Sequence, residues 1–239
     1  MSANTDWFQT MQANFALSAE AAWQLHEHGF VVLPDAVAPV QLSQFAAAYD
    51  EAVANADPAD IRVGSTTTRV NDFVNRAPIF DALYLAAPIL AASCRVIGRP
   101  FKLSTLHART LHPGATAQRL HVDFPRDDDG WPMLGFIFMV DEFRVENGAT
   151  RFVPGSQHSS QQPVNESATI AAGGAAGSVI LYNGAVWHGH GTNQTNQPRR
   201  SLQGAYIRRT ATAGGQLPAR MLPATLERIS PLAKYLLAL

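Results

Sequence analysis

The 239-residue chain has a single cysteine, few charges and no long apolar run. One cysteine excludes an internal disulfide and a cysteine-rich zinc site, and the apolar residues around Cys94 predict a buried, inert thiol. No stretch approaches the roughly 18 unbroken apolar residues of a membrane-spanning helix, and the first residues lack the apolar core of a secretory signal. We therefore expect a cytoplasmic protein with no membrane partner.

Charge of either sign is scarce. Charged residues make up 15% of the chain, the formal net charge is -1, and the basic residues form no long run. Because a nucleic-acid-binding surface needs a basic patch, we expect no nucleic acid as partner, only a small-molecule substrate. Hydrophobic residues make up 46%, which is typical of a folded globular chain. We expect a single domain over residues 1–239, and the sequence leaves the oligomeric state open.

Helical patterns dominate about the first 100 residues. Helices are predicted over 18–28, 39–55 and 79–97. Pro88 is expected to kink or split the third helix, and Phe30–Leu33 is expected to form a short strand. The polar segment 57–77, with its threonine run, is predicted to be a loop.

From residue 101 onward the pattern changes to short β-rich runs separated by turn signals. Strands are predicted over 101–111, 119–124, 133–141, 149–153, 178–183 and 200–209. A last helical stretch at about 223–238 is interrupted by Pro231. Helices followed by six or more short strands favour a mostly β fold with flanking helices. Its core, about 101–210, is expected to be a double-stranded β-helix, that is, a jelly roll of the cupin-like kind.

Two residues of the predicted strand 119–124 can bind a metal ion. His121 and Asp123 occupy positions i and i+2, so their side chains share a face of the strand and can converge on one ion. Alone, such a pair arises easily by chance, and a solvated or salt-bridged pair is the usual alternative.

A third ligand is available in His188, which follows the run 178–183 at a turn. Two imidazoles and a carboxylate on one face of an octahedron leave three positions open. That arrangement suits iron(II) that binds a bidentate co-substrate and then dioxygen, although these donors also accept zinc or manganese.

Arg199 lies 11 residues beyond His188, at the start of the next predicted strand. A guanidinium is permanently charged and pairs with a carboxylate through two parallel hydrogen bonds. Arg199 could therefore hold the far carboxylate of a dicarboxylate whose other end chelates the metal. The alternative is that Arg199 and Arg200 are ordinary surface cations.

Five blocks follow one another along the chain: HGFVVLP at 28–34, QRLHVD at 118–123, ENGATRFVPGS at 146–156, GSVILY at 177–182, and WHGHGTN with PRR at 187–200. Together they resemble the phytanoyl-CoA dioxygenase-like branch of the iron(II)/2-oxoglutarate oxygenases. The resemblance runs from about residue 20 to residue 210, and although each block is common, the ordered set is specific.

The resemblance assigns roles to individual residues. It implies that His121, Asp123 and His188 are the ligands of iron(II) and that Arg199 pairs with the distal carboxylate of 2-oxoglutarate. The halogenating relatives carry a small residue in place of the carboxylate, so Asp123 argues for oxygen transfer.

Other positions follow from the same resemblance. It implies that Gln118 and Thr150 hydrogen-bond the co-substrate and that Arg69 reaches the pocket. We expect specificity to lie in the loops 62–76 and 124–134 and in the segment after Arg209, since loops carry specificity in such folds. The substrate candidates in these loops are Arg69, Phe124 and Trp131.

The remaining histidines complicate the assignment. His158 stands one place later than the family pattern has its histidine, and His190 could compete with His188 as a ligand. The interval of 11 residues to Arg199 favours His188. The other histidines are expected to lie on the surface or in satisfied core positions: His26, His28, His107 and His112.

The implied activity is that of a dioxygenase that consumes 2-oxoglutarate and O2, releases succinate and CO2, and oxidises an unactivated C–H bond of a small metabolite or natural-product intermediate. Hydroxylation is the expected outcome, although desaturation, epimerisation or ring closure would use the same residues. The alternatives are a cupin-type metal-dependent lyase or isomerase without 2-oxoglutarate, and a jelly roll that binds a small molecule without turnover.

Overall fold

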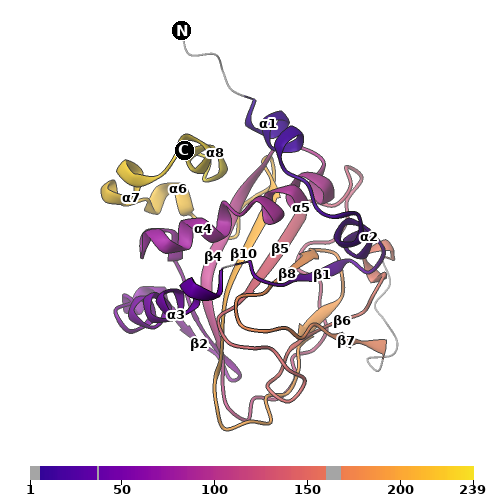
Figure 1. Cartoon of the computed structure of the whole chain (residues 1–239), viewed down its shortest axis with the longest axis vertical. Coiled ribbons are helices and arrows are strands. Elements are labelled where there is room, and N and C mark those ends of the chain that lie inside the picture. Colours follow the sequence, from indigo (N-terminus) through magenta and orange to yellow (C-terminus); the bar gives the residue numbers. More distant parts are fainter. Residues whose placement is uncertain (1–5, 37, 160–167) are drawn as a thin grey trace.

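Two antiparallel sheets, with helices packed against the larger one, form the computed structural model, which describes residues 6–36, 38–159 and 168–239 (Figure 1). The strands are β1 Phe30–Leu33, β2 Ile61–Val63, β3 Thr67–Val70, β4 Phe101–Leu111, β5 Met133–Met139, β6 Thr150–Phe152, β7 Ile170–Ala171, β8 Val179–Asn183, β9 His188–His190 and β10 Arg199–Arg208. The large sheet has the order β1-β8-β5-β10-β4-β3-β2, and the small sheet has the order β7-β6-β9.

Short helices flank this β core. They are α1 Trp7–Asn14, α2 Ala19–Glu27, α3 Pro39–Ala54, α4 Asp81–Tyr84, α5 Ala87–Ile97, α6 Leu217–Arg220, α7 Pro223–Arg228 and α8 Pro231–Leu236. Local signals set their ends. The Ser18 side chain accepts a hydrogen bond from the Ala21 amide at the start of α2, and Gly98, at φ 65°, ends α5 in the left-handed conformation that glycine adopts easily.

Each face of the large sheet packs against a separate hydrophobic core. On one face, helices α1, α2, α3, α5 and α8 pack against alternate residues of the central strands, such as Leu106, Phe136 and Leu202. On the other face, a second core lies between the two sheets and contains Phe152 of the small sheet and Ile180 of the large one. Burial on both sides explains why β5 and β8 consist of buried residues only.

Several sequence-based expectations are confirmed. The mostly β fold with flanking helices is observed, and the helices predicted at 18–28 and 39–55 correspond to α2 and α3. The strand predicted at 101–111 coincides with β4, and Cys94 is buried. The C-terminal helical stretch is interrupted before Pro231, as expected, and Pro231 begins α8.

Other expectations are wrong. The segment 57–77 is not a loop, because it contains β2 and β3, which pair with each other and extend the large sheet beyond β4. The predicted strand 119–124 is reduced to one isolated bridge at His121, and the short strands β7 and β9 were not foreseen. The third helix breaks at Leu85 rather than at Pro88, which lies in the first turn of α5, where the missing amide hydrogen of proline costs nothing.

Among the described residues, no single helix is long and apolar enough to cross a membrane, whereas one bent pair, Pro78–Tyr84 with Ala87–Ile97, meets the test of length and composition.

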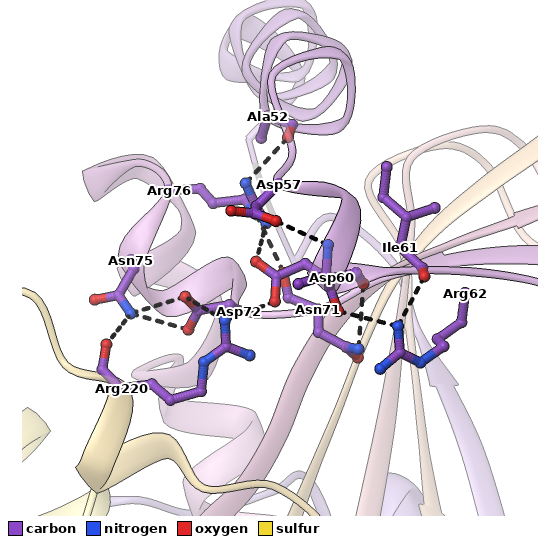
Figure 2. Close-up of polar contacts among 11 residues, drawn as sticks. Ala52, Asp57, Asp60, Ile61, Arg62, Asn71, Asp72, Asn75, Arg76 and Arg220 are labelled. Atoms are coloured by element: carbon purple, nitrogen blue, oxygen red, sulfur yellow. Dashed lines mark hydrogen bonds and ion pairs between the residues drawn. The ribbon is translucent and has the colours of Figure 1, made fainter.

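A buried carboxylate ties the C-terminal helices to the edge of the large sheet (Figure 2). Asp60, 5% exposed, precedes β2 and pairs with Arg76 at 2.8 Å and with Arg220 at 2.6 Å. Asn75 adds a second link, because its side-chain amide donates to the backbone oxygen of Arg220 at 2.9 Å. The network therefore holds the end of α6 against the segment before α4.

We expect Asp60→Asn to lower the free energy of unfolding by about 3 kcal/mol, because it leaves the largely buried Arg76 guanidinium without its counter-charge. Urea unfolding followed by circular dichroism measures the loss. Asp57→Asn is the matched control: Asp57 accepts from the Ala59 amide at an exposed site, and asparagine retains that acceptor. A loss of less than about 1 kcal/mol in Asp60→Asn would contradict the importance of this pair.

Candidate metal centre and active-site cavity

The side chains of His121, Asp123 and His188 converge. Their ligand atoms all lie within 4.8 Å of one another. The Nε2 atom of His121 is 3.6 Å from Asp123 Oδ1, and the Nε2 atom of His188 is 3.6 Å from Asp123 Oδ2. Two imidazoles and one carboxylate at these distances form a donor set that suits a divalent transition metal, with positions left open for other ligands.

A reciprocal pair of backbone hydrogen bonds positions the two histidines. The amide of His121 donates to the carbonyl of His188, and the amide of His188 donates to the carbonyl of His121, each at 2.9 Å. Gly189 allows this approach, because a Cβ atom there would lie 3.0 Å from the backbone oxygen of Gln118. The single bridge therefore positions His121, a role that was expected of a longer strand over 119–124.

The backbone also fixes which ring nitrogen of each histidine faces the metal position. His121 Nδ1 lies 3.2 Å from the carbonyl oxygen of Arg119, and His188 Nδ1 lies 3.0 Å from that of Val186. Since a carbonyl only accepts, each Nδ1 carries the proton and each Nε2 presents a lone pair. Burial lowers the pKa of His188, which favours the neutral ring, whereas the adjacent Asp123 carboxylate raises the pKa of His121.

Asp123 is held as an oriented anion. Burial by itself would raise its pKa, but the adjacent imidazoles of His121 and His188 and the hydrogen bond from the Tyr182 hydroxyl hold the pKa well below its usual range. The Tyr182 hydroxyl donates to Asp123 Oδ2 at 2.7 Å, and burial raises the pKa of Tyr182, which keeps that proton in place. The carboxylate therefore keeps its charge at neutral pH.

The three residues open onto a cavity of about 380 Å³ that Arg199 also lines. Arg199 is 4% exposed, and its guanidinium carbon lies 3.7 Å from the centre of the Phe143 ring. In the part of the chain that the structure describes, its Nε and Nη1 have no hydrogen-bond partner. Burial, followed by repulsion from Arg109, lowers the pKa of Arg199 to about 9, so the group remains charged at neutral pH. Buried donors without partners are costly, so this guanidinium calls for an anionic ligand.

Comparison with known proteins identifies the family. The profile of the phytanoyl-CoA dioxygenase (PhyH) family matches residues 25–201. The chain belongs to the phytanoyl-CoA dioxygenase family. It is 31% identical over 202 residues to dioxygenase trt7 of Aspergillus terreus, a match that covers 77% of this chain and 71% of that protein. It is 30% identical over 220 residues to the multifunctional dioxygenase prhA of Penicillium brasilianum, covering 79% and 71%.

Solved structures share the fold of this phytanoyl-CoA dioxygenase family member. HygX from Streptomyces hygroscopicus, crystallised with nickel and 2-oxoglutarate, has a TM-score of 0.69 at 18% identity and covers 83% of this chain and 90% of its own. The carbocyclase SnoK from nogalamycin biosynthesis has a TM-score of 0.68 at 19% identity and covers 87% and 92%. At these identities the likeness shows the fold, which has the expected jelly-roll core.

The structure brings most of the predicted site residues of the family member to one cavity. Its lining includes the three metal-ligand candidates with Arg199, Gln118, Thr150, Arg69 and Phe124. Trp131 is not among the lining residues. Its indole Nε1 donates to the backbone oxygen of Gln157 at 3.3 Å, and its ring packs against His26 and His158.

The other two histidines lie outside the cluster of candidate metal ligands and have polar contacts of their own. His190 lies 2.9 Å from the Gly191 oxygen through Nδ1 and 3.4 Å from Thr66 Oγ1 through Nε2, and it is not part of the metal-ligand cluster. His158 Nε2 lies 3.1 Å from the backbone oxygen of His26, outside the cavity lining.

Several residues of the cavity lining were missed in the sequence, among them Tyr182, His107 and Arg109. His107 was expected to be a surface or satisfied core residue, yet it lines the cavity and its buried Nε2 has no partner among the described residues. Arg109 lines the cavity beside it and donates from Nη2 to Gln118 Oε1 at 3.3 Å. Their alternation along β4 was the available signal, because residues 105, 107 and 109 share one face of that strand.

Tyr182→Phe should weaken binding of iron(II) or a substitute divalent ion by about 10- to 100-fold, because a ligand that loses its supporting hydrogen bond is less well oriented and less well charged. Anaerobic competition against a chromophoric chelator measures the change. Tyr235→Phe removes a hydroxyl outside the cavity and is the control. Loss of less than about threefold in Tyr182→Phe would show that Asp123 needs no such support.

Proposed function

We propose that the chain is an iron(II)- and 2-oxoglutarate-dependent dioxygenase that hydroxylates an unactivated C–H bond of a small metabolite or natural-product intermediate. His121, Asp123 and His188 hold the iron, and Arg199 holds the distal carboxylate of 2-oxoglutarate. Membership of the phytanoyl-CoA dioxygenase family and the dioxygenase names of the relatives support this reaction class. The observation that carries the proposal is a buried, unpartnered guanidinium that shares one cavity with a two-histidine, one-carboxylate cluster.

The residues present fit both groups. Each Nε2 of the two histidines is available, the carboxylate is anionic, and no cysteine competes for a softer metal. A dicarboxylate supplies the oxyanion that Arg199 lacks, while Thr150 and Gln118 line the same cavity as hydrogen-bonding groups. HygX was crystallised with nickel and 2-oxoglutarate, and the epimerase SnoN with Fe3+ and alpha ketoglutarate, which supports the same pairing here.

When bound, iron(II) with 2-oxoglutarate and O2 supplies the oxidising chemistry and releases succinate and CO2. The protein residues bind and orient. Arg199 fixes one end of the co-substrate, Tyr182 keeps Asp123 ionised and aligned, and Phe143 shields the guanidinium from water. Such fixed geometry in a dry cavity is the protein's contribution to this class of reaction.

Structural neighbours with the same fold are described as a carbocyclase and an epimerase, so the fold alone does not decide the outcome. Hydroxylation is proposed because Asp123 occupies the third ligand position and leaves no space there for a halide.

In the first test, iron(II) and then 2-oxoglutarate are added anaerobically to metal-free protein, and the weak visible charge-transfer band of the chelate is measured. Wild-type protein should show the band, and Arg199→Ala should need at least about 30-fold more 2-oxoglutarate, because a charge-assisted pair worth about 2 kcal/mol is lost. Arg200→Ala is the matched control, because Arg200 pairs with Asp141 and Asp50 and does not line the cavity.

Absence of the band in wild-type protein that demonstrably holds iron would reject the proposal in favour of a cupin-type lyase or isomerase, or of a binding protein. An equal effect of the Arg199 and Arg200 variants would reject the role given to Arg199.

Asp123→Ala and His188→Ala should each abolish iron retention and succinate formation, because two protein ligands rarely hold a catalytic divalent ion. Metal content after gel filtration and succinate assay measure the two losses. His190→Ala serves as the control for metal content, and retention of iron by His188→Ala together with its loss from His190→Ala would exchange the two assignments.

A further inference from the structure

Three arginines stand directly opposite one another across the edge of the large sheet. Arg62 of β2 is the register partner of Arg69 of β3, and Arg69 is the partner of Arg109 of β4. Residues in such register lie side by side on one face of the sheet, and like charges in that arrangement are destabilising. Arg62 and Arg69 are exposed to solvent, which screens this repulsion, whereas Arg109 is partly buried.

The members of the row differ in what they contact. Arg62 lies outside the cavity lining and donates to the backbone oxygens of Ala59 and Ile61, each at 3.0 Å (Figure 2). Arg69 and Arg109 both line the cavity, and within the described residues no carboxylate forms an ion pair with either. Their charge therefore faces the space that the reactants occupy.

Iron(II) and 2-oxoglutarate do not neutralise this charge. Iron(II) carries two positive charges and 2-oxoglutarate carries two negative ones, so together they add no net charge. The cavity then holds the guanidiniums of Arg69, Arg109 and Arg199 against the single carboxylate of Asp123. Arg199 serves the distal carboxylate of 2-oxoglutarate, and the carboxylate at the chelating end lies on the metal. At least one guanidinium remains without an anionic partner after the co-substrate is bound.

His107 is consistent with a positive field at this end of the cavity. Burial, followed by the charges of Arg69 and Arg109, lowers its pKa to about 3, so the ring stays neutral and cannot add to the charge. Its buried Nε2 has no partner among the described residues and adds an unused polar contact beside the two arginines.

Part of the cavity lining is apolar. Phe124, Met133, Ile137 and Ile207 contribute to it. The cavity therefore combines cationic side chains with apolar ones, which suits a molecule with one charged group and a hydrocarbon body.

We propose that the substrate carries an acidic group, a carboxylate or a phosphate, that binds to Arg69 and Arg109 while its apolar body lies along Phe124, Met133 and Ile207. The guanidinium pair recognises the oxyanion, and His107 supplies a further polar contact. This substrate class rests on the proposed dioxygenase function and deepens it, because it supplies an anionic partner for positive charge that the co-substrate leaves without one.

The experiment measures binding of matched probes to the anaerobic protein loaded with iron(II) and 2-oxoglutarate. The probes are straight-chain carboxylic acids from hexanoate to decanoate, the corresponding primary amides and the corresponding alkyl phosphates, and ligand-observed NMR reports their affinity.

At least one anionic series should bind about tenfold or more tightly than the amides, and whether the acids or the phosphates bind better identifies the group. Arg69→Gln and Arg109→Gln should each reduce that preference to less than about threefold. Such a change corresponds to the loss of one charge-assisted contact.

Arg62→Gln is the matched control, because it removes one positive charge from the same row outside the cavity, and it should leave the preference for anions intact. Amides that bind as well as the anions overturn the inference, and so does a failure of every probe to bind. It is also overturned if Arg69→Gln and Arg109→Gln raise the 2-oxoglutarate requirement as much as Arg199→Ala does, because both arginines then serve the co-substrate. The charge-transfer band separates the two proposals: a missing band rejects the dioxygenase assignment, whereas a normal band without anion preference rejects only the acidic substrate.

Discussion

The backbone bridge between His121 and His188 is the constraint on which the active site depends. These residues are 67 positions apart in the sequence, and their two reciprocal hydrogen bonds of 2.9 Å bring the side chains close enough to bind one ion. The bridge also orders the segment that carries Asp123, whose amide donates to the Gly184 oxygen at 3.0 Å. His188 is anchored in the small sheet, since its strand β9 pairs with β6. The jelly roll thus supplies the metal site through main-chain pairing rather than through side-chain packing.

The buried charge of Arg199 is the complementary feature. A guanidinium enclosed without partners costs several kcal/mol, and contact with the face of Phe143 offsets only part of that cost. The rest of the molecule must therefore hold Arg199 in place, and β10 does so from the centre of the large sheet, hydrogen-bonded to β4 on one side and β5 on the other. Binding of a carboxylate recovers the energy at the point where the reaction needs a fixed co-substrate. The buried Arg199 guanidinium lowers the local stability of the fold and makes the cavity selective for an anion.

Elements set by local interactions were predictable from the sequence, whereas elements set by pairing between distant segments were not. Helix α2 and strand β4 were predicted closely because capping at Ser18 and alternation along 101–111 are local signals. The segment 57–77 was misread because β2 pairs only with β3, and β3 joins the sheet through β4, which lies about 40 residues away, so tertiary pairing is needed to reveal both strands.

The metal ligands were predictable from motif order, whereas His107 and Arg109 were not. Alternation shows that these two residues share a face of β4, but which face borders a cavity depends on how the second sheet closes over the first. Trp131 illustrates the reverse error: it belongs to the expected loop, yet its indole hydrogen bond to Gln157 turns it away from the cavity lining.

The cavity is lined both by residues inside the family match and by residues outside it. The family match ends at residue 201, but Ile207, Thr212 and Gly214 also line the cavity. The Gly214 amide donates to Ser104 Oγ at 2.9 Å, and Ser104 lies where the register of β4 and β10 shifts, a bulge of the kind often found beside active sites. A second cavity of about 290 Å³ shares Ser104, Thr105 and Gly214 with the first and continues to Arg220.

The same Arg220 is paired with the buried Asp60, so the segment that lines both cavities is fastened by the network at the edge of the sheet. The candidate metal ligands and Arg199 lie inside the family match, whereas part of the cavity wall comes from a C-terminal segment outside it. That segment is held by these polar contacts and by apolar residues of the core on the helical face, such as Leu217 and Leu236, and it contributes none of the candidate metal ligands. This separation is a physical basis for one fold to act on different substrates, as loops do on other rigid scaffolds.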